Sequence, residues 1–122
     1  MAKFDFEQLK GRYESIPDEV REAISSLDVA DKLQEIGLAH SLHIDKIADL
    51  AENVGLVMLG LLHPQKFAAT IEKELGIKAD EAVTITTDIN QEIFRPIQDS
   101  LHKMHEGGGP AAPVGAAGDG VL

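Results

Sequence analysis

The stretch VGLVMLGLLHP, residues 54–64, decides the fold of this chain. From Val54 to Leu62 every residue is apolar or glycine, so a helix made from it has no polar side to face water and must be buried all round. Upstream, apolar residues recur at helical spacing from Ile44 onward. The two segments together predict one long central helix that ends at His63-Pro64.

Two glycines, Gly55 and Gly60, would lie inside this central helix. Each costs about 1 kcal/mol relative to alanine in a helix interior, so the pattern predicts that a neighbouring helix crosses closely there. Met58, between them, is expected in the core. The predicted structural centre comprises Gly55, Met58, Gly60 and Pro64, with Pro96 from the last helix.

Helical spacing of apolar residues also runs through the rest of the chain. It predicts a short helix around Leu9, a second that starts after Pro17, a third capped by Ser26 or Asp28, a fourth from Pro64 to Gly76 and a last one over residues 82–105. The chain is therefore predicted to be all-α, a compact bundle of five or six helices around the buried central one.

The last predicted helix contains two features that oppose a regular helix. Residues 83–87 read VTITT and have strand propensity, but apolar residues step by three and four across the whole segment, which favours a helix. Pro96 removes the hydrogen bond to the Glu92 carbonyl, which predicts a kink.

The C-terminal segment 107–122, GGGPAAPVGAAGDGVL, has almost no side chains to bury and is predicted to be a disordered Gly/Ala/Pro tail. The predicted organisation is a short, partly packed N-terminal helix in residues 1–15, a helical bundle domain in residues 16–106, and this tail.

Charge and composition limit the class of protein. The chain has 11 Lys and Arg against 21 Asp and Glu, a net charge of −10, and no two basic residues are adjacent, so neither nucleic acid nor an anionic membrane surface is an expected partner. The longest apolar stretch is far shorter than the roughly 20 residues of a membrane span. The chain has no cysteine and no apolar leader, and a cytoplasmic location is expected.

Two histidine pairs are candidate metal ligands. His40 with His43, and His102 with His105, have i, i+3 spacing, and Asp99 lies three residues before His102. On one helical face such groups can bind a transition metal. The other interpretation is that His40 and His43 flank a turn and that the second pair occupies a last helical turn, where cations suit the helix dipole. We expect that no metal or cofactor is required.

No catalytic constellation is visible, because no serine or cysteine accompanies a base at a recognisable spacing and no glycine-rich phosphate loop joins a strand to a helix. The chain is expected not to be an enzyme. The first functional hypothesis is a non-enzymatic protein-interaction module or assembly subunit, whose unknown partner could be a second copy that covers the apolar central helix. The alternative is a small metal- or ligand-binding helical bundle that uses the histidine pairs.

Several motifs support a family resemblance. They are Gly37-x-x-His40-x-Leu42-x-Ile44-Asp45, GLVMLGL-x-HP from Gly55 to Pro64, Leu75-Gly76, and IN-x-x-IFRPI-x-x-SL from Ile89 to Leu101. Residues 16–105 resemble a family of small acidic all-helical domains found as hypothetical proteins in uncultivated, small-genome bacteria. The resemblance implies an all-helical fold, a cytoplasmic setting and a low-complexity tail, and it transfers no catalytic residues. Lys78 departs from it, where an acidic N-cap is expected, so the start of the last helix stays open.

Overall fold

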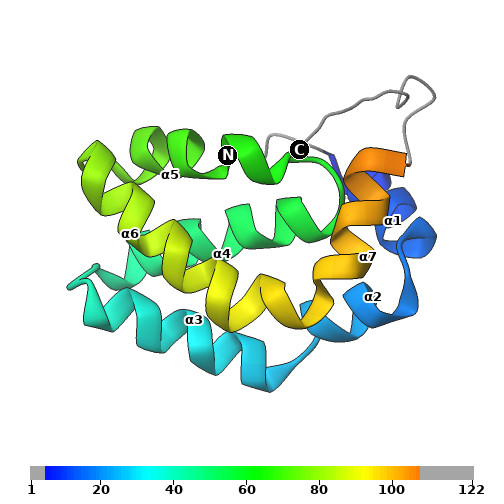
Figure 1. Cartoon of the computed structure of the whole chain (residues 1–122), viewed down its shortest axis with the longest axis horizontal. Helices are drawn as coiled ribbons and strands as arrows, with labels where there is room; N and C mark the ends of the chain where they lie inside the picture. Colours follow the sequence, from blue (N-terminus) through cyan, green and yellow to red (C-terminus); the bar gives the residue numbers. More distant parts are fainter. Residues whose placement is uncertain (1–4, 108–122) are drawn as a thin grey trace.

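The computed structural model of this chain describes residues 5–107. The elements are α1 (Phe6–Ser15), α2 (Asp18–Ile24), α3 (Leu27–Ala39), α4 (Ile44–Met58), η1 (Pro64–Lys66), α5 (Phe67–Leu75), α6 (Ala79–Ile89), η2 (Asn90–Phe94), η3 (Arg95–Ile97), α7 (Gln98–His102) and η4 (Lys103–Gly107). Since η1 runs directly into α5, and α6 continues through to η4, these residues form six helical rods and no strand (Figure 1). The all-α prediction is confirmed.

Helix α4 is the centre of the bundle, between α3 and α5 in Figure 1. Its second half buries side chains on all sides, with Val54, Leu56 and Val57 in the core and Met58 only 1% exposed. The other helices of the same chain provide this cover. The prediction of a buried central helix is therefore confirmed.

The end of the central helix differs from the prediction. Helix α4 stops at Met58, and Gly60 follows in a left-handed turn with a φ of 78°. The backbone N–H groups of Gly60 and Leu61 donate to the last carbonyls of the helix, at 3.1 and 2.9 Å, as in glycine-terminated helices. The prediction that Gly60 lies inside the helix was wrong, because the apolar run continues past the turn without a polar residue to mark it.

The packing reason predicted for Gly55 was also wrong. A Cβ atom on Gly55 would meet no atom within 4 Å outside its own helix, so no neighbouring helix crosses closely there. Pro64 begins η1 and does not end α4. His63 caps η1 through its Nδ1 atom, which accepts from the backbone N–H of Gln65 at 3.1 Å.

Local signals at the other helix ends are confirmed. Pro17 precedes the first residue of α2, and the Ser26 hydroxyl accepts from the backbone N–H groups of Asp28 and Val29 at the start of α3. Gly76 ends α5 with a φ of 67°. Lys78 gives no side-chain cap to α6, whose first turn instead carries two acidic residues that suit the positive end of the helix dipole.

The kink expected at Pro96 is present. The last helix changes from α to π in η2 and to 3-10 in η3, and its direction turns toward α7 (Figure 1). The Glu92 carbonyl, which Pro96 leaves without an i+4 donor, accepts from the ammonium group of Lys32 on α3 at 3.4 Å. The strand-like residues 83–87 lie within α6.

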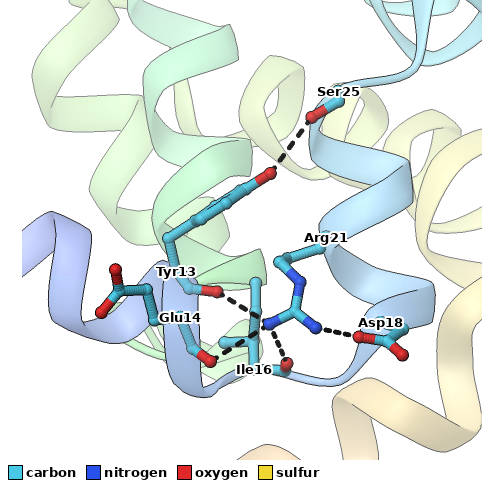
Figure 2. Close-up of polar contacts among 6 residues, drawn as sticks. All are labelled: Tyr13, Glu14, Ile16, Asp18, Arg21 and Ser25. Atoms are coloured by element: carbon cyan, nitrogen blue, oxygen red, sulfur yellow. Dashed lines mark hydrogen bonds and ion pairs between the residues drawn. The ribbon is translucent and has the colours of Figure 1, made fainter.

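Helix α1 is attached mainly through polar groups. It has no buried residue, and the Nε atom of Arg12 donates to the Leu59 carbonyl at 3.0 Å. From α2, Arg21 donates to the carbonyls of Tyr13, Glu14 and Ile16 at 3.2, 3.1 and 2.9 Å (Figure 2). Arg21 therefore satisfies the carbonyl end of α1, and its second amino group pairs with Asp18.

The N-terminal and C-terminal parts of the bundle meet where α2 packs against η3 and α7. Ser100 donates its hydroxyl to a Glu19 carboxylate oxygen at 2.5 Å, although the two residues are 81 positions apart. Within residues 5–107 no helix is long and apolar enough to cross a membrane. The predicted tail lies, apart from Gly107, outside the described residues, as do residues 1–4 of the predicted N-terminal helix.

Candidate functional site

A cleft of about 500 Å³ lies between η1 and the kinked last helix. It is lined by His63, Pro64, Gln65, Asn90, Gln91, Phe94, Arg95, Gln98, Leu101, His102 and His105. We call it the histidine cleft. Its volume lies within the range of small-molecule sites in proteins, about 300–1,000 Å³.

The irregular backbone of the last helix supplies most of the lining. Asn90, Gln91 and Phe94 come from the π-helical η2, and His105 comes from the second π-helical stretch, η4. Such stretches are rare and frequently occur at functional sites. The departure from α-helix caused by Pro96 therefore bears directly on the shape of this cleft.

The least exposed residues of the lining are apolar. Phe94 and Leu101 are only 6% and 5% exposed, yet both border the cleft. Phe94 is held edge-on against the fully buried Phe67, with ring centroids 5.9 Å apart at an interplanar angle of 80°. This part of the cleft is therefore anchored in the core and keeps its shape.

His63 and His105 form an edge-to-face pair, with ring centroids 5.2 Å apart. The Nδ1 atom of His63 accepts from the Gln65 N–H, so a neutral His63 carries its proton on Nε2. The Nε2 atom of His105 lies 2.9 Å from the Val57 carbonyl, which can only accept, so His105 donates from Nε2. His105 thereby ties η4 to the carbonyl end of α4.

The cleft differs in charge from the chain as a whole. None of its described lining residues is acidic, although the sequence has 21 Asp and Glu. The side chains of Arg12 and Arg21 donate to backbone carbonyls, whereas the Arg95 side chain makes no hydrogen bond or ion pair with residues 5–105. The His102 side chain is likewise without such a partner in the described part of the chain. The cleft thus presents an uncompensated cation.

A second hollow, of about 520 Å³, adjoins the first. It is lined by Arg12, Ser15, Ile16, Gly60, Leu61, His63, Met104 and His105. Because His63 and His105 belong to both linings, this histidine pair lies where the two hollows meet.

The structure separates the histidines predicted as metal candidates. His40 pairs with Asp88, at 2.8 Å from Nε2 to Oδ2, and joins the end of α3 to α6. His43 is 89% exposed and lies 3.9 Å from Asp45. His102 and His105 both line the histidine cleft, whereas Asp99 does not. No three His, Asp or Glu residues between positions 5 and 105 are grouped to hold a metal ion.

His63 and Arg95 were not predicted as site residues. The sequence pattern placed His63 only at the end of the central helix and Arg95 only within a motif. The available signal was the position of Arg95 directly before Pro96, where a kink was predicted.

No protein-family model, curated protein or solved structure matches this chain. The resemblance to small acidic helical domains stays a prediction. The function must therefore be inferred from the histidine cleft itself.

Proposed function

We propose that this chain is a non-enzymatic binding module that takes an anionic group of its partner into the histidine cleft. The observation that carries the proposal is the Arg95 side chain, which has no partner among residues 5–105 and lies in a cleft whose described lining has no carboxylate, on a chain of net charge −10. A guanidinium group offers a planar set of donors that matches a carboxylate or phosphate. An acidic cytoplasmic protein would present such a group to a partner mainly for recognition.

The lining supports binding better than catalysis. Among the described residues it includes no serine, threonine, cysteine, lysine or carboxylate side chain, so these residues supply neither such a nucleophile nor a carboxylate base. His63 and His105 each use one ring nitrogen to hold the backbone. Because both rings are held in this way, the two histidines are better suited to forming a rigid surface of the cleft than to transferring a proton.

The expected affinity for an isolated anion is modest. A charge-assisted hydrogen bond contributes about 1.5–3 kcal/mol at best, and solvent screening lowers this at an exposed arginine. A small anion alone should therefore bind in the millimolar range. A protein partner would gain its remaining affinity from contacts around the cleft.

The test is an NMR titration of the full chain with glutarate, a compact dicarboxylate. We expect amide shifts confined to residues 63–65 and 90–105, which form the cleft, and a Kd at least tenfold weaker in Arg95→Gln. Lys103→Gln is the matched control, because Lys103 is exposed on the same helix, lies outside the lining and changes the net charge equally. Its Kd should change less than twofold. Equal weakening in both variants, or shifts spread over the surface, would refute the proposal.

A further inference from the structure

We infer that the group bound in the histidine cleft is a single carboxylate attached to an apolar aromatic or branched group. This inference rests on the proposed function and specifies its ligand. The chemistry is shared by free aryl-alkanoic acids and by the C-terminal residue of a peptide that ends in an apolar side chain.

The rim of the cleft is a row of hydrogen-bond donors. Gln91, Arg95, Gln98 and His102 are spaced by four, three and four residues, the spacing of neighbours along one side of a helix, and all four are exposed and line the cleft. Arg95 therefore has an amide side chain on either side of it. Two amides that flank a guanidinium provide N–H donors for both oxygens of one carboxylate.

The buried part of the lining has the opposite chemistry. Phe94 and Leu101 contribute nearly buried apolar surface to the same cleft, and Pro64 adds to it from η1. A ligand that offered only charge would leave this surface in contact with water. An aromatic or branched group next to the carboxylate removes it from water and adds hydrophobic stabilisation.

The charge of the whole chain argues against a polyanion. With a net charge of −10, the protein repels multiply charged ligands at distances comparable to the Debye length, about 8 Å at physiological ionic strength. A ligand with one negative charge meets little of this repulsion and still pairs with Arg95. The apolar group then supplies the affinity that additional charges cannot.

The experiment compares four probes on the full chain by NMR titration: 3-phenylpropionate, its neutral amide 3-phenylpropanamide, propionate and glutarate. We expect 3-phenylpropionate to bind at least tenfold more tightly than each of the others, with shifts at residues 90–105. If glutarate or propionate binds as tightly as 3-phenylpropionate in an Arg95-dependent manner, the apolar part of the inference is refuted and the proposed function stands. If the neutral amide binds as tightly as the acid, or no acid binds, both are refuted.

A substitution on the rim provides the matched protein control. Gln98→Glu places a carboxylate beside Arg95 and should weaken 3-phenylpropionate at least tenfold without changing the weak binding of the amide. Gln34→Glu makes the same change at an exposed position of α3 outside the lining and should leave both affinities within twofold. Unchanged acid binding in Gln98→Glu, with an unchanged unfolding midpoint, would overturn the inference.

Two peptides distinguish the sources of the carboxylate. A short peptide that ends in phenylalanine is titrated as its free acid and as its C-terminal amide. Binding of the free acid alone identifies a peptide C-terminus as a ligand of this class. Failure of both peptides, with 3-phenylpropionate still bound, restricts the class to free acids.

Discussion

Helices α1 and α5 have nearly the same length but are attached to the bundle in opposite ways. Helix α5 buries Phe67, Ile71 and Leu75 at 1% exposure or less, whereas α1 buries no residue and leaves Phe6 73% exposed. Helix α1 depends on hydrogen bonds from Arg12 and Arg21 to backbone carbonyls. Helix α5 is therefore held by buried apolar side chains, whereas α1 is held by hydrogen bonds to backbone carbonyls.

This difference in attachment determines which of the two helices can unfold separately from the rest of the bundle. Because α5 is part of the core, it can be lost only when the whole bundle unfolds. An isolated helix of ten residues is marginal in water, and the exposed hydrogen bonds that hold α1 contribute about 0.5–1.5 kcal/mol each. Helix α1 is therefore expected to open separately, well below the free energy of global unfolding.

The largest effect is expected from Phe67→Ala in α5. Phe67 is fully buried and packs against Phe94, so its truncation should lower the free energy of unfolding by about 3–5 kcal/mol. Urea denaturation followed by circular dichroism measures this change. A loss below about 1 kcal/mol would contradict the role given to α5.

A smaller loss of stability is expected from Gly60→Ala, in the turn that follows α4 and contacts Arg12 of α1. The φ of 78° disfavours alanine by about 1–2 kcal/mol, and the new Cβ atom would meet the guanidinium group of Arg12. The docking of α1 should weaken together with the turn. Thermal unfolding and amide hydrogen exchange in α1 measure the two effects.

Gly55→Ala is the matched control for this substitution. Gly55 lies in α4 with open space at its Cβ position, so alanine should stabilise the protein by about 0.5–1 kcal/mol. Opposite signs at the two glycines are expected. The same sign of the stability change at both glycines would contradict a left-handed conformation of Gly60 in the turn after Met58.

Arg21→Ala tests the polar attachment of α1 directly. It removes the donors to three carbonyls and should lower the free energy of unfolding by about 1 kcal/mol. Amide protection in α1 should fall further than protection in α5, because the two helices open at different free energies. Hydrogen exchange that changes equally in both helices would mean that α1 belongs to the same cooperative unit.

The smallest effect is expected from Phe6→Ala. Since Phe6 is largely exposed, its removal should change the free energy of unfolding by less than about 0.5 kcal/mol. Urea denaturation alongside Phe67→Ala gives the direct contrast between two phenylalanines. A cost above about 1 kcal/mol would show that α1 packs on apolar surface after all.

Signals that act within a few residues could be predicted from the sequence. Ser26, Gly76 and Pro96 each determine backbone geometry or hydrogen bonding in their own turn of the chain, and all three predictions are confirmed. The end of α4 could not be predicted, because the residues after Met58 are as apolar as those before it. The choice between helix and turn there depends on what packs around Gly60, including Arg12 from α1.

The histidine cleft could be predicted only in part. His102 and His105 were singled out by their spacing, but the cleft also needs His63, which contacts His105 across more than thirty residues of sequence. Asn53 is another example: it is fully buried in α4, and its Nδ2 atom donates to the Asp49 carbonyl at 2.9 Å. A buried position could not be predicted from the residue type, because asparagine is mostly exposed in proteins.

The contact between Ser100 and Glu19 has a consequence for the rate of folding. Helices α3 to α6 each pack on the next one along the chain, so these contacts form with little loss of chain entropy and favour rapid folding. The pairing of α2 with α7 must instead bring together residues 81 positions apart. That closure is expected after the main barrier, so mutations there should change the unfolding rate far more than the folding rate.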